Sequence, residues 1–374
     1  SNRHEWSDVM LNTITILIWI AVVTAAVSLT NARRVVLQYG KREYRYPKAA
    51  AWAMAIPIII WAGTRGYVAD TSLYRIGFQN AADSIFAIPG YLSAQPQDPG
   101  YGVFQIALKS VIGNHDVVYF TIIAAICALC VILTYQKYSC SLPLSVFLFV
   151  ASSDCYQWLF NGMRQFIPAA GLFAAMGFLL KKRYAAFVIL TLIGATFHLS
   201  ALLLIPAAFL VQGKAWNRKT LLFFAAIAVS ILFLEQFTDL LERALSNTQY
   251  DDVVSQFARD DGTNIFRVLV YAVPVLLSLV GKRQIDRYDS PIINLCVNMS
   301  ILSLGIYILS MFTSGIYIGR IPVFFSLYNY ILLPWEIEAL FDRRSANLIR
   351  ILMICFYMAF CYYQMTISWG VSLY

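Results

Sequence analysis

Long apolar runs separated by short polar segments occupy almost the whole chain. A helix needs about 20 mostly apolar residues to cross a bilayer, and runs of this kind recur from Val9 to the end of the sequence. The pattern predicts one polytopic membrane domain over residues 1–374, built from about twelve helical segments. These segments are residues 9–29, 49–63, 116–135, 142–159, 162–180, 184–197, 199–212, 220–236, 265–280, 291–312, 319–335 and 347–368.

The apolar stretch from Tyr184 to Val211 allows two interpretations. It is longer than one span requires, and basic residues flank it at both ends. Two short half-spans with His198 near the outer turn would keep both basic clusters on one side of the membrane, and Pro206 is compatible with a broken helix. One long tilted helix is the alternative. We favour the pair of short segments.

The composition supports a membrane protein. Hydrophobic residues make up 60% of the chain and charged residues 13%, whereas a soluble domain has about 25% charged residues. A soluble enzyme, a disordered chain and a fibrous repeat are therefore excluded. The net charge of +8 reflects topology, because most basic residues fall in alternate loops. By the positive-inside rule those loops face the cytoplasm, so both termini face outward.

Two outer loops, residues 64–115 and 237–264, are too long to be simple turns. Loops of this length in compact proteins are usually functional or disordered. Gly102–Ile112 and Leu240–Ala258 have the pattern of short amphipathic helices. The second loop also holds adjacent acidic pairs at 251–252 and 260–261, for which a solvated acidic face is favoured over a cation site.

The first outer loop combines a carboxylate with aromatic residues. On a helix, Asp70, Tyr74 and Phe78 share one face. A carboxylate that accepts hydroxyl hydrogen bonds, beside rings that stack on a sugar, suits carbohydrate binding. The alternative is that Asp70 caps a helix and pairs with Arg75. The sequence favours neither.

Three arginines stand at the outer starts of apolar spans. An arginine at a helix start opposes the helix dipole, so it is not there as a favourable cap. It can snorkel to water or bind phosphate through its planar, bidentate donors. With Arg65 and Arg75 nearby, the set indicates an anion site in the outer leaflet. The three residues are Arg164, Arg267 and Arg320.

His198 is the one histidine inside an apolar run, and a neutral histidine can accept a proton at pH 7. The usual alternative is a buried histidine bonded to a neighbouring helix. The chain has no Walker A loop, GxSxG elbow, HExxH or DxD motif. Familiar cofactor-binding motifs are therefore absent, and an outward site would meet neither ATP nor nucleotide sugars at useful levels. A donor at an outward site must arrive preactivated, most naturally on a lipid.

At these residues the sequence resembles the EpsG family of Wzy-type polysaccharide polymerases. The resemblance extends over roughly residues 30 to 370 as an ordered series of short motifs. They are Asp70–Phe78, Pro99–Phe104, Gly162–Gln165, Phe197–Ala201 followed by Pro206, Gly319–Pro322 and Leu333–Pro334.

The resemblance implies an all-α, polytopic membrane glycosyltransferase with a GT-C-like architecture. Such enzymes build O-antigen, capsule or exopolysaccharide in bacteria. They transfer a glycan from a polyprenyl (undecaprenyl) pyrophosphate donor to a lipid-linked repeat unit, at the outer face of the cytoplasmic membrane. The resemblance also implies a metal-independent, inverting reaction. Membrane lipids, and a flippase and a chain-length regulator of the same pathway, are the further partners that it implies.

We assign roles on this basis as a hypothesis. Arg164 and Arg320 hold the pyrophosphate. His198 is the first choice of base and Asp70 the second. The expected substrate-binding residues are Arg75, Tyr74, Tyr101, Arg65, Gln165 and Arg267. The alternatives are a glycan ligase, a secondary transporter or lipid-linked oligosaccharide flippase, and a membrane acyltransferase.

Overall fold

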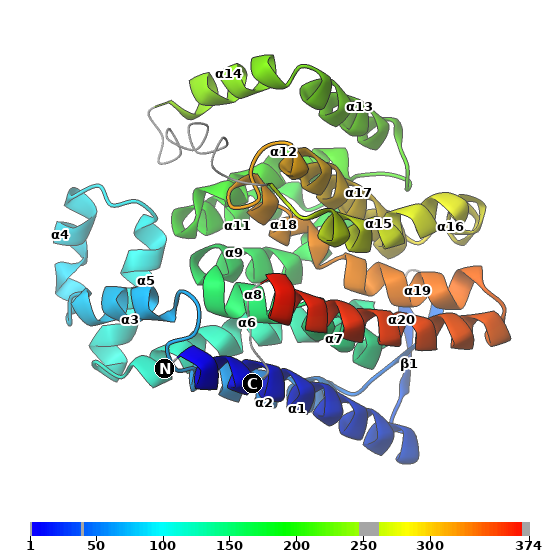
Figure 1. The fold of residues 1–374 in the computed structure, drawn as a ribbon, viewed down its shortest axis with the longest axis horizontal. Helices are drawn as coiled ribbons and strands as arrows, with labels where there is room; N and C mark the ends of the chain where they lie inside the picture. Colours follow the sequence, from blue (N-terminus) through cyan, green and yellow to red (C-terminus); the bar gives the residue numbers. More distant parts are fainter. Residues whose placement is uncertain (1, 39–40, 247–261, 369–374) are drawn as a thin grey trace.

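The computed structural model describes residues 2–38, 41–246 and 262–368, which form a bundle of helices with one β-hairpin (Figure 1). In chain order the elements are α1 (Asn2–Leu29), β1 (Arg34–Gln38), β2 (Lys41–Arg45), α2 (Lys48–Gly63), α3 (Thr71–Asn80), η1 (Ile85–Ala87), α4 (Ile88–Ser93), α5 (Pro99–Ile112), α6 (Asp116–Tyr138), α7 (Leu142–Ala151), α8 (Asp154–Asn161), α9 (Met163–Ala174), α10 (Met176–Leu180), α11 (Tyr184–Phe197), η2 (Leu199–Leu203), α12 (Leu204–Leu210), α13 (Arg218–Leu232), α14 (Leu234–Leu245), α15 (Ile265–Val280), α16 (Lys282–Tyr288), α17 (Pro291–Met311), η4 (Ile318–Arg320), α18 (Val323–Ser326), α19 (Asn329–Leu340), α20 (Arg343–Tyr363) and η5 (Gln364–Ser368).

The core forms around α6 and α17. α6 packs between α2 and α9, and α17 packs against α13, α15 and α19. Both central helices are apolar around most of their circumference, and such helices are stable when neighbours surround them. α1 and α20 lie on the outside of the bundle and keep large exposed apolar faces, as expected for helices that meet lipid.

Five helices are long and apolar enough to cross a membrane. They are Val9–Leu29, Asp116–Tyr138, Met163–Leu180, Pro291–Met311 and Arg343–Ile367, and the number rises to seven if each of two bent helix pairs counts as one span. Four shorter apolar helices, including α2 and α11, accompany them among the described residues. The chain is thus a helical membrane protein, and the number of about twelve spans stays a prediction.

The stretch from Tyr184 to Val211 is broken, as we favoured. α11 ends at Phe197, His198 takes an extended conformation, and η2 and α12 fold back onto α11. Pro206 does not cause the break, because it lies in the first turn of α12, where backbone N–H groups lack intrahelical partners in any case.

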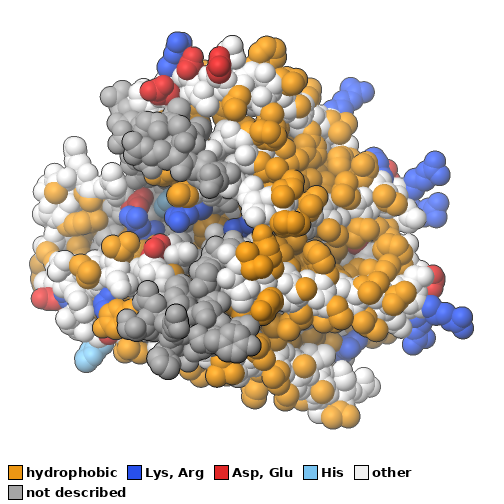
Figure 2. Space-filling view, viewed as in Figure 1, with side chains coloured by type: hydrophobic (Ala, Val, Ile, Leu, Met, Phe, Trp, Pro, Cys, Tyr) orange, Lys and Arg blue, Asp and Glu red, His pale blue; other side chains and the backbone are white. Residues whose placement is uncertain are grey.

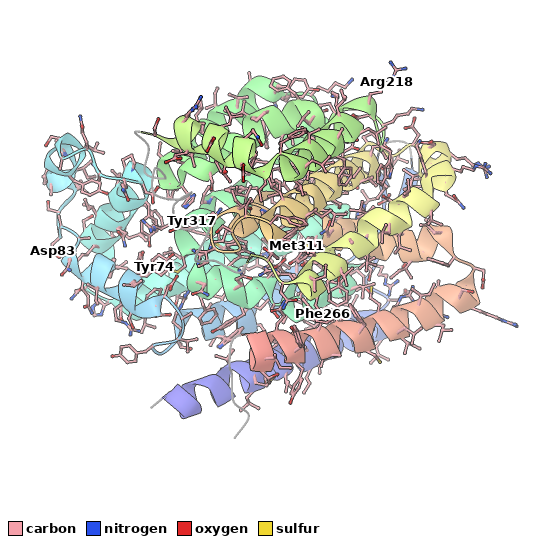
Figure 3. The ribbon with its side chains drawn as sticks, turned by 45° about the horizontal axis from the view of Figure 1, so that its top comes forward. Tyr74, Asp83, Arg218, Phe266, Met311 and Tyr317 are labelled. Carbon is pink, nitrogen blue, oxygen red and sulfur yellow. The ribbon has the colours of Figure 1, made fainter. Side chains whose placement is uncertain are left out.

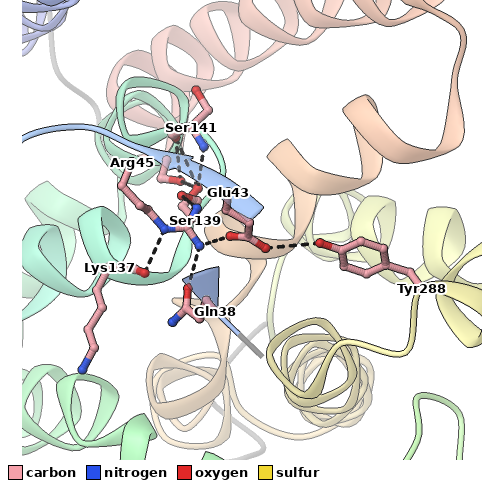
Figure 4. A network of polar contacts seen from close by, with 8 residues as sticks. Gln38, Glu43, Arg45, Lys137, Ser139, Ser141 and Tyr288 are labelled. Carbon is pink, nitrogen blue, oxygen red and sulfur yellow. Dashed lines mark hydrogen bonds and ion pairs between the residues drawn. The ribbon is translucent and has the colours of Figure 1, made fainter. Parts of the chain in front are cut away.

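The polar segment before α2 forms an antiparallel β-hairpin. We expected an all-helical chain, so this hairpin was not predicted. Arg34 lies opposite Arg45 in its register. Arg45 is buried and donates to the carbonyls of Lys137 and Ser139 at 3.0 and 2.8 Å (Figure 4). Its guanidinium also binds Glu43, which accepts a bond from Tyr288 on α16. The hairpin is therefore fixed to the α6–α7 connection through side chains that no local sequence pattern indicates.

The first long loop contains the amphipathic helix predicted for it, and the second contains the described part of its predicted helix. Gly102–Ile112 lies within α5, which confirms that expectation. Leu240–Ala258 is helical as far as Leu245, in α14, which turns by 104° from α13. The rest of that segment, and the acidic pairs at 251–252 and 260–261, lie outside the described residues.

The two ends of the molecule differ in charge. Lys and Arg side chains gather at the right-hand end in Figure 2, which carries the hairpin, α16 and the start of α20, beyond a broad hydrophobic surface. We call this the basic end. α3, α4 and α5 lie at the opposite end (Figure 1). This separation of charge along the bundle is the pattern that the positive-inside rule describes.

Candidate functional site

A polar pocket lies where α3, α4 and α5 meet the start of α9. It has a volume of about 450 Å³. Gly102 makes it possible for α4 and α5 to approach closely, because a Cβ there would lie 1.9 Å from the Tyr91 hydroxyl. Four residues expected in the site line this pocket, and the lining residues that were not expected include two with ionisable side chains. These residues are Asp70, Tyr74, Tyr101 and Arg164, and then Tyr91 and Asp98.

Asp98 is the one acidic residue of this pocket that sequence reasoning missed. Its carboxylate accepts a hydrogen bond from Arg164 Nη1 at 2.9 Å. The backbone of Asp98 is left-handed, with φ of 37°, immediately before Pro99 starts α5. An aspartate before a proline at a helix start signals a turn, and its pairing with an arginine 66 positions away depends on the fold.

An apolar pocket of about 390 Å³ lies on the other side of the start of α9. Side chains of η2, α14 and η4 form most of its wall, among them Leu203, Leu241 and Ile318. Three polar residues line it as well: Gln165, His198 and Arg320. Tyr74 of the polar pocket and Tyr317 of the apolar pocket both lie toward the end of the molecule that carries α3 (Figure 3). Arg164 and Gln165, consecutive on α9, thus each face a different pocket.

Hydrogen bonds tie the polar residues of the apolar pocket together. His198 Nδ1 lies 2.6 Å from Ser200 Oγ. Gln165 Nε2 donates to the same hydroxyl at 3.2 Å and to the carbonyl of Arg320 at 3.4 Å. Gln165 therefore links the histidine turn to η4.

The positive charges of Arg164 and Arg320 affect the pKa values of both candidate bases. Burial raises the pKa of Asp70, and the positive charges of Arg320 and Arg164 oppose that rise. Burial, with the same two arginines, lowers the pKa of His198 to about 4. His198 is therefore neutral at pH 7 and able to accept a proton. Arg320 has no hydrogen bond or ion pair from its guanidinium to any described residue.

The alternative role for Asp70 is wrong. Asp70 stands at the first position before α3, but its side chain makes no capping bond. Arg75 pairs with Asp116 instead, with Nε 2.5 Å from Oδ2. Asp70 is thus left facing the pocket beside Tyr74.

Three of the arginines expected in the site lie outside the two pockets and bind other groups. The Arg65 guanidinium lies between the rings of Phe120 and Phe160, 4.5 Å from each centroid, and donates to backbone carbonyls. Arg267 donates to Gln157 at 2.6 Å and lies 3.6 Å from the fully buried Asp154. The structure does not bring these two, or Arg75, into the pair of pockets.

No group of three or more His, Cys, Asp or Glu side chains with a geometry for metal binding occurs in the described part of the chain.

No curated protein and no solved structure shows significant similarity to the chain. The model of the EpsG family matches residues 50–373. The chain belongs to the EpsG family, the family of Wzy-type polysaccharide polymerases.

Proposed function

We propose that this protein is a bacterial membrane polymerase that takes a glycan from a polyprenyl-pyrophosphate donor and joins it to a lipid-linked repeat unit. Membership of the EpsG family supports the polymerase class. The observation that carries the substrate assignment is the pair of neighbouring pockets, one polar and one apolar, divided by Arg164 and Gln165.

The two pockets suit the two halves of such a donor. In the proposal the sugars enter the polar pocket, where Tyr74 and Tyr101 offer ring faces and Asp70 accepts hydroxyl hydrogen bonds. The first isoprene units of the lipid enter the apolar pocket, against leucines such as Leu203 and Leu241. The pyrophosphate then lies at the boundary, next to Arg164 and Arg320.

The reaction that we propose is a direct displacement. The acceptor hydroxyl loses its proton to the base, its oxygen bonds to the anomeric carbon, and the bond from that carbon to the phosphate oxygen breaks. Negative charge grows on the leaving pyrophosphate, and the guanidiniums of Arg164 and Arg320 stabilise it. The anomeric centre is inverted. No metal takes part in this scheme.

His198 is the proposed base. Its neutral state at pH 7 follows from burial and from the two nearby arginines. An arriving pyrophosphate offsets the charge of those arginines, so it raises the pKa of His198 and makes the ring a stronger base in the loaded site. Asp70 is the second candidate, and Gln165 is a positioning residue because it binds the Ser200 hydroxyl that contacts His198.

Arg65, Arg75 and Arg267 belong to the framework of the site in this proposal. Each guanidinium already has partners: backbone carbonyls and rings for Arg65, Asp116 for Arg75, and Gln157 for Arg267. Removing one of them therefore loosens the elements around the pockets and does not remove a direct contact with the donor.

We also propose that about twelve segments cross or enter the cytoplasmic membrane in a GT-C-like arrangement, with both termini outward and the pockets at the outer face. Support comes from the charge separation between the basic end and the end that carries α3 to α5. An outer site is also where a lipid-linked donor can replace a nucleotide sugar.

The test is an assay with purified protein and a lipid-linked repeat unit, with products separated on a gel. We expect a ladder of polymer, which Arg164→Ala and Arg320→Ala strongly reduce and the basic-end variant Arg344→Ala preserves. One transfer to a different acceptor without a ladder supports a ligase. Unchanged substrate together with transport into vesicles supports a transporter. Either of the last two results overturns the proposal.

A further inference from the structure

A basic pocket lies at the basic end, away from the candidate site. It has a volume of about 650 Å³. The end of α1, the residues around the hairpin, the α6–α7 connection, the end of α19 and the start of α20 form its walls. Its charged lining residues are Arg33, Arg343, Arg350 and Glu338, and its neutral polar ones include Tyr46, Ser141 and Asn347.

We infer that this pocket binds the phosphate group of an anionic phospholipid from the membrane. Three guanidiniums and one carboxylate line it, so its net charge is positive. Arginine recognises phosphate oxygens through paired N–H donors. A basic pocket between membrane helices at the positive side is the kind of place where anionic headgroups bind.

The arginines keep donors available for a ligand. The guanidinium of Arg343 has no hydrogen bond or ion pair with any described residue. Arg343 is the first residue of α20, where a positive charge is unfavourable because it opposes the helix dipole. Arg33 donates only to the neutral hydroxyl of Tyr46, at 2.9 Å. Arg350 donates from Nη1 to the neutral amide of Asn347 at 2.9 Å, and its ion pair with Glu338, at 3.6 Å, is beyond hydrogen-bond distance. One carboxylate therefore leaves most of the positive charge uncompensated.

Hydrogen bonds hold the backbone segments that form the wall of the pocket in place. Ser141 lies in the α6–α7 connection that Arg45 fixes to the hairpin (Figure 4). The carbonyl of Tyr46 accepts a bond from Gln136 at 2.7 Å, which holds the segment after the hairpin onto α6. A prearranged pocket binds a headgroup without first having to order a loop.

A lipid fits better than a soluble phosphate because apolar surface continues from the pocket. α7 packs against both α1 and α20, so these two outer helices flank it. Along α20 beyond the pocket, Leu348, Ile351 and Leu352 are each more than half exposed. On α1, Val22 is 52% exposed. Acyl chains of a bound lipid would cover these side chains while the headgroup occupies the pocket.

The test is native mass spectrometry of the full chain in detergent. The three probes are dioctanoyl phosphatidylglycerol, dioctanoyl phosphatidylcholine and glycerol 3-phosphate. We expect the anionic lipid to bind more tightly than either other probe. Since a basic residue near the membrane surface changes affinity about fivefold, the double variant Arg343→Gln with Arg350→Gln should bind the anionic lipid roughly twentyfold more weakly.

The matched control is Arg34→Gln with Arg344→Gln, which removes two neighbouring arginines that do not line the pocket. It should leave affinity within about twofold. Glu338→Gln removes the negative lining charge and should tighten binding, a gain that damage to the fold would not produce. If the double variant fails to fold, Arg33→Gln tests the same pocket.

Three results would overturn the inference. Equal loss in the control pair means that only overall charge matters. Equal binding of the zwitterionic lipid, which has the same phosphate beside a choline cation, means that the pocket does not select a headgroup of net negative charge. Equal binding of glycerol 3-phosphate means that the pocket takes a soluble phosphate and not a lipid.

Discussion

Arg164 Nη1 lies 2.9 Å from Asp98 Oδ2, so the arginine proposed to hold the pyrophosphate is paired with a carboxylate of the same pocket. The two residues belong to different elements, the start of α9 and the turn before α5. The side chain of Arg164 is 47% exposed. A phosphate that approaches it therefore competes with Asp98 and does not need to displace buried packing.

The first prediction concerns this competition. Asp98→Asn keeps the shape of the side chain but removes its charge, so Arg164 should bind anions more readily. Because a partly exposed ion pair contributes about 0.2–1 kcal/mol, we expect inhibition by inorganic pyrophosphate to tighten about two- to fivefold. The measurement is the inhibition constant in the polymerisation assay. An unchanged constant, with normal expression, would show that Asp98 does not compete for Arg164.

Arg320 should matter for the shape of its donors and not only for its charge. Arg320→Ala should lower kcat/KM by about 10²–10³, the usual loss when one donor to a developing negative charge is removed. Arg320→Lys keeps a point charge without the bidentate fork, so it should recover only part of that loss. Full recovery by lysine would assign Arg320 a purely electrostatic role. Arg344→Ala serves as the control at the basic end.

The pH dependence separates the two candidate bases. A base must be unprotonated, so activity falls as pH falls through its pKa. Burial and the two nearby arginines lower the pKa of His198 to about 4, and a bound donor should raise it. The acid limb of kcat should therefore lie at higher pH than the limb of kcat/KM, which reports the free enzyme.

His198→Gln should remove that shift and lower kcat about 10²–10⁴-fold. Asp70→Asn should leave the shift in place and mainly raise KM, because the proposal gives Asp70 a role in holding sugars. If Asp70→Asn abolishes the acid limb instead, Asp70 is the base. Rate profiles from about pH 4 to 9 on both variants decide between them.

Much of the site could be inferred from residue types that stand out in an apolar sequence. Asp70, Tyr74 and Arg164 share a pocket, as expected from the aromatic loop and the arginine at a helix start. The break at His198 was equally visible in the charge pattern. In each case the signal is local: a polar residue where its neighbours are apolar.

What the sequence did not reveal depends on partners from distant segments. Arg267 has the same local setting as Arg164, yet Gln157 of α8 engages it away from the pockets. Arg65 is surrounded by two rings that lie far along the chain. The hairpin was missed because its strands are short, basic and largely exposed, and it is fixed by the buried side chain of Arg45.

The contact between α5 and α11 should be intolerant of any side chain at Gly100. A Cβ there would lie 2.0 Å from Thr196 Oγ1 and 3.0 Å from the backbone carbon of the same residue, so a rotation of Thr196 alone cannot make room. We expect Gly100→Ala to destabilise the protein by about 1–3 kcal/mol. Gly171→Ala is the control, since nothing lies within 4 Å of its Cβ. It should be neutral or stabilising by up to about 1 kcal/mol, because alanine favours a helix. Thermal unfolding in detergent measures both.

The apolar pocket can be tested through the length of the lipid. Leu203 lines it and is 40% exposed, so Leu203→Trp can fill the pocket without disrupting a buried core. If isoprene units occupy this space, the variant should raise KM about tenfold for a long-chain polyprenyl donor, a loss equivalent to about 1.4 kcal/mol of apolar contact. A donor whose lipid is a single short isoprenoid makes fewer of these contacts and should be affected less. The control is Leu222→Trp, on the exposed face of α13 and outside the pocket. Equal effects of Leu203→Trp on both donors would place the lipid elsewhere, whereas a selective loss with the long chain ties this pocket to the donor.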